Sequence, residues 1–347
     1  MERELIERVQ QAVAEKRPLC IRGGATKAFY GRHCVGELLE LSGHRGIVAY
    51  EPSELVITVR AGTPLAEVDT VLAEHGQMFP FEPPRFGAEA TVGGMVAAGL
   101  SGPRRPWGGA VRDAVLGVRL LNGRGEVLRL GGQVMKNVAG YDLARLMAGA
   151  LGTLGVLLEV SLKVLPRPVE ERTLAFELDA AEAARRVIDW GRQPLPLSAT
   201  LYAEGRLQVR LSGGGQCLAT ARAALGGEEV GNAIWPSLRE QDLPFFQTGA
   251  PLWRIALPPA APDLHLPGET LVEWGGALRW LRGEAVAERV HQRAALLGGH
   301  ATLFKGGDAN AEVFQPMPPA MRALQRRVKQ ALDPLGIFNP GRIYAEL

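Results

Sequence analysis

Apolar residues near the start of the chain recur first at helical spacing and then in short runs. This pattern predicts an amphipathic helix over residues 3–15, because one face is apolar and the opposite face is charged. The apolar face consists of Leu5, Ile6, Val9 and Val13. Short apolar runs predict strands at 19–21, 38–41 and 55–60. After the last run, Thr63 suits an N-cap and Pro64 the first position of a second helix.

The middle of the chain continues to alternate between strand, turn and helix patterns. The predicted elements are a hairpin at 115–121 and 126–130, a helix at 139–150 and a half-buried strand at 156–164. Pro166 and Pro168 then interrupt the pattern, which indicates a domain boundary. Alternation of this kind predicts an α+β or α/β layered core.

The second half predicts a smaller α+β unit over residues 169–312. Its expected elements are strands at 172–178 and 207–211 and helices at 180–190, 219–225 and 285–297. Prolines at 251–267 indicate irregular chain around one edge strand. A last helix is expected at 320–332, and the tail after it is expected to return to the first half. We therefore expect three parts, at 1–168, 169–312 and 313–347.

Composition excludes several classes of protein. The 347 residues are 46% hydrophobic, which favours a globular fold, and the net charge of +2 provides no strong field to recruit nucleic acid. No apolar run reaches membrane-spanning length, and the start lacks a signal-peptide pattern. Three cysteines, Cys20, Cys34 and Cys217, are odd in number and lack C-x-x-C spacing. They favour a reducing compartment and argue against an iron–sulfur or zinc site. We expect a cytoplasmic protein without direct membrane insertion.

A glycine-rich turn follows the first predicted strand, in the run Arg22-Gly23-Gly24-Ala25-Thr26-Lys27. Glycines let the backbone turn sharply and approach a ligand, and successive N–H groups in such a turn can bind an anion. The flanking arginine, threonine and lysine add donors and charge that suit a diphosphate. The run matches neither the Walker A sequence nor the G-x-G-x-x-G fingerprint, and an ordinary Gly-Gly turn is the alternative.

Residues 87–102 carry almost only small side chains, although a core segment usually carries larger apolar ones. Small side chains are needed where a bulky group that is not protein lies against the backbone. The alternative is close packing of a helix through glycine and alanine. Because the Gly23-Gly24 turn lies upstream, we favour a ligand-binding segment.

Several motifs occur together in one order along the chain. They are Arg22-Gly23-Gly24-x-Thr26-Lys27, Thr91-Val92-Gly93-Gly94, Trp107-Gly108 with Arg112-Asp113, Lys136 to Leu143, Gly152-Thr153-Leu154-Gly155-Val156 and Asp333 to Arg342. Together they resemble the FAD-binding domain of the vanillyl-alcohol oxidase and para-cresol methylhydroxylase (PCMH) superfamily. Within it, the chain is similar to a family of FAD-binding subunits of bacterial glycolate oxidases. The resemblance implies an α+β fold, with a two-subdomain PCMH-type FAD-binding domain and a short α+β cap domain.

The resemblance also implies which residues bind FAD. The pyrophosphate is expected at Arg22, Gly23, Gly24, Ala25, Thr26 and Lys27. The ribityl and phosphate region is expected at Thr91, Gly93 and Gly94, the flavin at Ala97, Gly99 and Ser101, and the adenine end at the main chain of Val156. Pro83, Val92 and Gly152 complete the expected set. Relatives often tether the flavin to a histidine in the pyrophosphate loop, but this chain has Ala25 and Thr26 there, so we expect non-covalent FAD.

Catalytic groups are harder to assign from the sequence. Tyr141 and Arg342 are the candidates for positions near the flavin ring, and Arg342 could bind a carboxylate through both arms of its guanidinium. Helix capping and packing is the alternative for Tyr141 and Asp142. The six histidines include no H-x-H or H-x-x-x-H pair, so we expect no metal site.

The resemblance implies a subunit that oxidises glycolate, a small 2-hydroxy acid, to glyoxylate and passes electrons to a partner. Expected partners are a homologous flavoprotein subunit and an iron–sulfur subunit, through which the complex would lie at the inner membrane. No nucleic acid is expected. Two alternatives remain open, a non-catalytic FAD-binding relay or scaffold subunit and a stand-alone FAD-dependent oxidoreductase for another 2-hydroxy acid.

Overall fold

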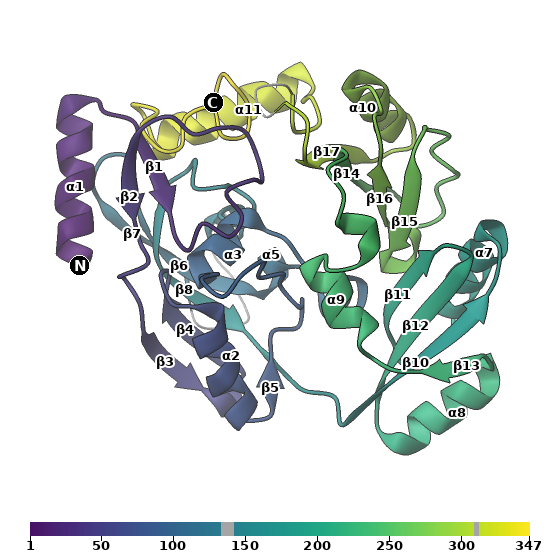
Figure 1. The fold of residues 1–347 in the computed structure, drawn as a ribbon. Helices are drawn as coiled ribbons and strands as arrows, with labels where there is room; N and C mark the ends of the chain where they lie inside the picture. Colours follow the sequence, from purple (N-terminus) through teal and green to yellow (C-terminus); the bar gives the residue numbers. More distant parts are fainter. Residues whose placement is uncertain (133–141, 309–311) are drawn as a thin grey trace.

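The computed structural model describes residues 1–132, 142–308 and 312–347 and contains two main β-sheets with helices packed against them (Figure 1). The strands of the first sheet come from residues 47–163 and those of the second from residues 170–305. Figure 1 shows the two sheets side by side, with the first drawn in blue and the second in teal and green. The observed mixture of helix and sheet confirms the predicted α+β class.

The first sheet has five antiparallel strands in the described part of the chain. Their spatial order is β3 (Ile47–Glu51), β4 (Val56–Arg60), β8 (Val156–Lys163), β6 (Val115–Leu121) and β7 (Val127–Gly131). The expected hairpin is β6 and β7. The central strand β8 is buried on both faces rather than half-buried as the alternation predicted. Its polar residues are satisfied by partners, since Ser161 hydrogen-bonds Thr58 at 2.8 Å and Glu159 pairs with Arg119 at 2.5 Å.

Short helices and a small parallel sheet cover the first sheet. The helices are α1 (Glu2–Glu15), α2 (Leu65–Glu74), α3 (Val92–Ala98), α4 (Arg105–Gly108), α5 (Val111–Ala114) and α6 (Leu143–Leu146). Strands β1 (Leu19–Arg22) and β2 (Glu37–Glu40) pair in parallel, and β5 (Gln77–Met78) pairs with β9 (Leu165–Pro166). Thr63 does not cap α2 as expected. Its hydroxyl donates to the carbonyl of Arg60 at 2.7 Å, and Pro64 occupies the N-cap position.

The second sheet has eight antiparallel strands in the described residues. Their order is β13 (Glu228–Val230), β10 (Glu170–Glu177), β12 (Arg206–Gly213), β11 (Leu197–Ala203), β15 (Glu269–Glu273), β16 (Leu278–Arg282), β14 (Leu252–Ala256) and β17 (His300–Lys305). The helices of this half are α7 (Ala180–Gly191), α8 (Gly215–Leu225), α9 (Ile234–Glu240) and α10 (Ala287–Leu296). The strand expected at an edge within 251–267 is β14, which lies instead between β16 and β17.

The C-terminal segment packs against the first half of the chain. Helix α11 (Pro319–Leu332), drawn in yellow in Figure 1, ends at the core of the first sheet. The buried ammonium group of Lys329 donates to the carbonyl oxygens of Thr153 and Phe338 and to the carboxylate of Asp333, at 2.7 to 2.9 Å. Phe338 also bridges to Leu19 of β1. The tail therefore completes the part of the molecule that the chain builds first.

A network of buried charges joins the two halves. Glu82 from the first half bonds Arg210 of β12 at 2.9 Å, and Arg104 contacts both Glu82 and Glu171 of β10. The Ser212 hydroxyl donates to Glu171 at 2.6 Å. Because Arg210 is only 3% exposed, removal of one partner would leave a buried charge without compensation. The network therefore fixes how the halves sit against each other.

Candidate functional site

The glycine turn predicted to bind a diphosphate follows directly from β1. In the described residues, the backbone N–H groups of Gly23, Gly24, Ala25, Thr26 and Lys27 donate to no protein acceptor. Ala25 adopts the left-handed conformation, with φ of 56°. Consecutive free N–H groups in a half-buried turn are the arrangement that binds anionic oxygens.

Helix α3 packs closely against its surroundings, with its N-cap residue Thr91 against Gly23 of the turn and its own Gly93 against Ala61. Thr91 caps the helix, since its hydroxyl accepts from the N–H of Gly94 at 3.2 Å. A Cβ atom at Gly23 would lie 2.4 Å from that hydroxyl, and one at Gly93 would lie 2.7 Å from the Cβ of Ala61. These glycines therefore let segments of the chain approach closely, so the close-packing alternative accounts for part of the small-residue pattern.

A cavity of about 80 Å³ lies between the turn, α3 and the segment before β8. We call it the glycine cavity. Its lining includes six of the predicted FAD-binding residues, Gly23, Thr91, Gly93, Gly94, Ala97 and Gly152. It also includes Ile21, Leu41, Ala61, Met147, Ala150, Leu151, Leu154, Gly155, Leu157 and Asn339. The structure thus brings together residues from four of the sequence motifs.

Other predicted FAD-binding residues lie around this cavity rather than in its wall. Gly24 packs against the backbone of Glu89, where a Cβ would lie 1.5 Å from the carbonyl oxygen. Arg22 forms an ion pair with Glu40 at 3.7 Å. The Lys27 ammonium group donates to the carbonyl of Arg85 at 3.1 Å, and burial lowers the pKa of Lys27 to about 8.

The remaining predicted residues occupy three different environments. Val92 and Val156 are core residues, and Val156 pairs with Leu121 in the sheet. Ser101 accepts a hydrogen bond from the N–H of Val111 at 3.2 Å. Pro83 lines a polar cavity beside the network between the two halves, and Gly99 lines a second cavity described below. The order of the motifs along the sequence therefore does not imply that all the predicted FAD-binding residues line one cavity.

Of the two predicted catalytic residues, the structure describes only Arg342. Tyr141 lies outside the described residues. The guanidinium group of Arg342 donates to the carbonyl oxygens of Ala28, Tyr30 and Arg32 at 2.6 to 2.9 Å. These contacts use the two terminal nitrogens that would bind a carboxylate, so Arg342 here fixes the loop after the glycine turn.

The cysteine expectation needs a correction. Cys20 of β1 and Cys34 form a disulfide, with Cα atoms 6.0 Å apart, and Cys217 is free and exposed. The odd number of cysteines was misleading, because one unpaired cysteine does not prevent the other two from forming a disulfide. The disulfide closes a loop that contains the whole glycine turn. The argument from cysteines for a reducing compartment therefore fails.

A second cavity, of about 450 Å³, lies between the two halves, and we call it the interdomain cavity. From the first half it is lined by Gly99, Arg105, Ala110, Arg112, Ala148 and Gly149. From the second half it is lined by Arg254, Ala256, Leu257, Pro258, Trp274, Ala277, Gly298, Gly299 and His300. It adjoins the glycine cavity, because Gly99 follows α3 and Gly149 hydrogen-bonds Val96 of that helix at 3.0 Å.

The wall of the interdomain cavity is basic. The guanidinium carbons of Arg105 and Arg254 lie 4.5 and 5.0 Å from the ring centre of Trp274. Burial and the nearby Arg254 and Arg105 lower the pKa of His300, which favours the neutral imidazole. Sequence reasoning missed this cluster. Arg105 and Arg112 lie beside or within a recognised motif, but their partners lie far away in the chain.

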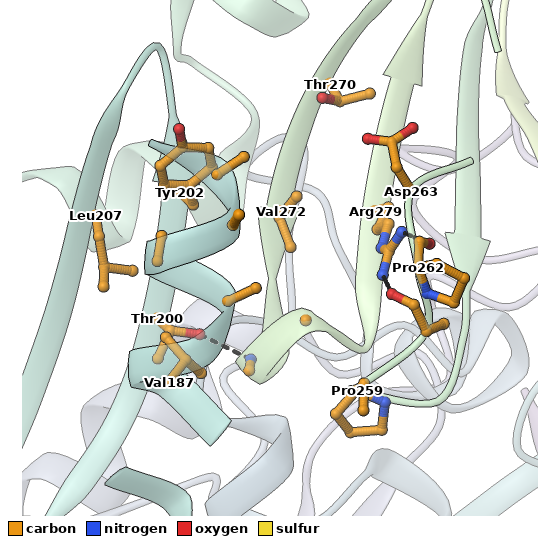
Figure 2. Close-up of a pocket in the computed structure, with 18 of the residues that line it drawn as sticks. Val187, Thr200, Tyr202, Leu207, Pro259, Pro262, Asp263, Thr270, Val272 and Arg279 are labelled. Carbon is orange, nitrogen blue, oxygen red and sulfur yellow. Dashed lines mark hydrogen bonds between the residues drawn. The ribbon is translucent and has the colours of Figure 1, made fainter. Parts of the chain in front are cut away.

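A further cavity, of about 460 Å³, lies wholly within the second half between α7, β11 and the loop before β15 (Figure 2). Its wall is mainly apolar, and two of its polar side chains have partners within the protein. The Thr200 hydroxyl accepts from the N–H of Gly275 at 2.7 Å, and Arg279 donates to Pro262 at 2.6 Å. Size alone would favour this cavity, but it adjoins neither the glycine turn nor the basic cluster.

The described residues contain neither a metal-binding cluster nor a membrane-spanning helix. No group of three or more histidine, cysteine, aspartate or glutamate side chains is arranged to hold a metal ion in residues 1–132, 142–308 and 312–347. Within the same ranges, no helix combines the length and apolar character needed to cross a membrane.

Comparison with known proteins identifies the class. A family profile described as an FAD binding domain matches residues 1–131. A solved structure of alkyldihydroxyacetonephosphate synthase superposes with a TM-score of 0.68 at 14% identity, covering 97% of this chain and 75% of that one. Together with the fold and the glycine cavity, these findings define an FAD-binding protein of the PCMH type. The predicted fold class and cofactor are confirmed.

Full-length similarity then identifies the family. The glycolate oxidase subunit GlcE of Escherichia coli (strain K12) is 53% identical over 343 residues, which cover 99% of this chain and 97% of that protein. The glycolate oxidase subunit GlcD of Bacillus subtilis (strain 168) is 31% identical over 187 residues, 53% of this chain and 39% of that protein. The chain belongs to the GlcE family of glycolate oxidase subunits, as its motifs predicted.

Proposed function

We propose that this chain is the FAD-binding subunit of a glycolate-oxidising complex, which converts glycolate to glyoxylate. Full-length similarity to GlcE supports the assignment to an enzyme of several subunits. The observation that carries the proposal is the run of free backbone N–H groups from Gly23 to Lys27 beside the glycine cavity. A family member without a cofactor role would have no need to leave these five donors without acceptors.

The glycine turn fits the pyrophosphate of FAD, because its free backbone N–H groups can donate to anionic oxygens. The glycine cavity is narrow, and small-molecule sites usually enclose about 300 to 1,000 Å³, so only a slender part of the cofactor could enter it. The pyrophosphate would be held by the N–H groups of 23–27, and Gly93 and Gly94 would let the ribityl chain pass α3. Bound FAD supplies the redox chemistry, and the protein supplies binding and orientation.

The same proposal assigns roles to the parts of the chain. Residues 1–168 would form the FAD-binding domain, 169–312 the cap and 313–347 a tail that returns to the first domain. A homologous flavoprotein subunit and an iron–sulfur subunit would complete the complex and accept the electrons. The complex would be cytoplasmic and would reach the inner membrane only through these partners. FAD would be bound without a covalent link.

The test is to purify the chain alone, record its visible spectrum and add glycolate without oxygen. We expect a flavin spectrum, with cofactor released by acid, that bleaches on addition of glycolate. A spectrum that stays unchanged would favour a relay or scaffold subunit. A folded, colourless chain that FAD cannot reconstitute would overturn the proposal. Copurification with two further subunits would distinguish a complex from a stand-alone enzyme.

A further inference from the structure

Two arginines of the interdomain cavity approach one aromatic ring from different halves of the molecule. Arg105 belongs to α4 of the first half and is exposed at the cavity, whereas Arg254 belongs to β14 and is half-buried. Both stack on Trp274, whose indole N–H donates to the carbonyl of Gly102 at 3.0 Å. The ring is therefore fixed with both guanidinium groups against it, and burial together with the charge of Arg254 lowers the pKa of Arg105.

In the part of the chain that the structure describes, these two charges lack a partner of opposite sign. Among the described residues, no carboxylate forms an ion pair or hydrogen bond with Arg105 or Arg254. Asp113 pairs instead with Arg112, at 3.6 Å. Glu273 is near Arg254, but it is buried, it accepts a hydrogen bond from Trp280 at 2.6 Å, and burial raises its pKa to about 7. Two like charges held together in a partly buried wall are costly unless an anion joins them.

We propose that the interdomain cavity is a binding site for a small carboxylate, which the guanidinium groups of Arg105 and Arg254 hold above Trp274. Guanidinium groups match carboxylates in geometry and bind them through charge-assisted hydrogen bonds. Under the proposed function this ligand is the 2-hydroxy acid substrate, so the identification as substrate rests on that proposal. The binding site itself does not.

The position of the cavity agrees with such a ligand. A volume of about 450 Å³ exceeds that of a two-carbon acid and leaves room for a second group beside it. The glycine cavity adjoins it across the end of α3, through Ala97 on one side and Gly99 on the other. A long cofactor in the first cavity and a small acid in the second would therefore meet at this wall.

The site is tested by calorimetric titration of the purified chain with oxamate, a small carboxylate that has no C–H hydrogen to lose. Tryptophan fluorescence provides a second readout, because Trp274 lies in the wall. The neutral counterpart oxamide serves as the matched ligand control. We expect one oxamate per chain and at least tenfold weaker binding of oxamide, because the neutral ligand cannot pair with the arginines.

Three variants test the residues. Arg105→Gln and Arg254→Gln should each weaken oxamate binding at least tenfold. Arg192→Gln, which removes the same charge from an exposed arginine at the end of α7, should leave it unchanged. Arg105 is exposed, so its variant is expected to fold even if the Arg254 variant does not. A thermal melt and the flavin content of each sample verify folding.

Two results would overturn the site. One is a folded wild-type chain that binds no oxamate at millimolar concentrations, and the other is an Arg105→Gln variant that binds it as tightly as the wild type. A different result would contradict the proposed function, namely a chain that binds oxamate but does not bind FAD. A chain that binds FAD but not oxamate would leave the proposed function intact and remove only this site.

Discussion

The two adjoining cavities differ in size and in the charge of their walls. The glycine cavity is narrow, about 80 Å³, and its wall contains no charged side chain among the described residues. The interdomain cavity is about 450 Å³, and three arginines and a histidine line it. Under the two proposals, the first would bind through shape, backbone N–H groups and neutral side chains, whereas the second would bind through charge. One chain would then separate the lasting binding of a cofactor from the transient binding of a small acid.

The cavities also differ in how the chain builds them. The glycine cavity is lined by residues 21–157 and by Asn339, so it belongs almost entirely to the first half. The interdomain cavity exists only where the two halves meet. Its geometry therefore depends on the buried network of Glu82, Arg104, Glu171 and Arg210 that fixes the halves.

The largest expected effect comes from Gly24→Ala. The new Cβ would lie 1.5 Å from the backbone oxygen of Glu89, which cannot move without displacing the chain. We expect a loss of about 4 kcal/mol in the free energy of unfolding and at least a tenfold loss of bound FAD. Denaturant unfolding and the flavin absorbance of the purified protein measure both effects.

Gly191→Ala provides the matched control, because a Cβ at Gly191 meets nothing within 4 Å. Its stability should stay within about 0.5 kcal/mol of the wild type. If folded Gly24→Ala protein loses FAD but still binds oxamate, the two cavities bind their ligands independently. Unchanged FAD content in that variant would contradict the role of the turn.

Glu273 should make stability depend on pH. Its pKa is raised from 4.5 to about 7 by burial, so the folded state binds more protons than the unfolded state between these values. The free energy of unfolding therefore falls as pH rises through this window, by up to about 3 kcal/mol. Glu273→Gln, which retains an oxygen for the Trp280 N–H, should remove this loss.

The measurement is denaturant unfolding of both proteins from pH 4.5 to 8. The advantage of Glu273→Gln over the wild type should grow with pH across the window. Glu269→Gln, on the same strand, is the control and should show no such growth, because Glu269 is exposed and its pairing with Arg282 lowers its pKa. A constant difference for Glu273→Gln would contradict the prediction.

The disulfide should support the glycine cavity alone. Cys20 and Cys34 are separated by 14 positions, and cross-links of this length stabilise proteins by about 2 kcal/mol or more. The double variant Cys20→Ser with Cys34→Ser should lose this stability and bind FAD several-fold more weakly. Fluorescence titration with FAD measures the affinity. Cys217→Ser is the control, and an equal loss of oxamate affinity would show that the two cavities are not independent.

The smallest effect is expected for His300. Burial and the adjacent arginines Arg254 and Arg105 lower its pKa, so the imidazole gains its proton only under acidic conditions. Protonation adds a further positive charge beside Arg105, Arg112 and Arg254, while Glu273 nearby also loses its charge. Oxamate affinity should rise about threefold on acidification, since exposed charge pairs contribute under about 1 kcal/mol. His300→Gln should flatten that rise in a calorimetric series, and an identical pH profile would contradict it.

Six of the predicted FAD-binding residues line the glycine cavity and only Gly99 lines the interdomain cavity, for a physical reason. The turn at 22–27 and the helix start at 91–94 each need glycine at fixed positions, because neighbouring atoms lie so close to these backbones that a Cβ would clash with them. Such requirements are local and appear as short motifs. The motif order then predicted the fold, the cofactor and the family.

The basic cluster has no local signature. Arg254 and His300 come together through the pairing of β14 with β17, and the packing of the halves then brings Arg105 of α4 to them. For Arg342 the sequence motif was recognised, but the contacts of its side chain differ from the predicted ones. The motif does not tell whether a guanidinium meets a ligand or, as here, the carbonyls of Ala28, Tyr30 and Arg32.

The contacts of the C-terminal tail have a consequence for biosynthesis. The ribosome makes Ile21 of β1 318 positions before Asn339, whose side chain accepts a hydrogen bond from the N–H of Ile21, and Leu19 bridges to the neighbouring Phe338. The first half therefore cannot complete these contacts until the whole second half has been translated.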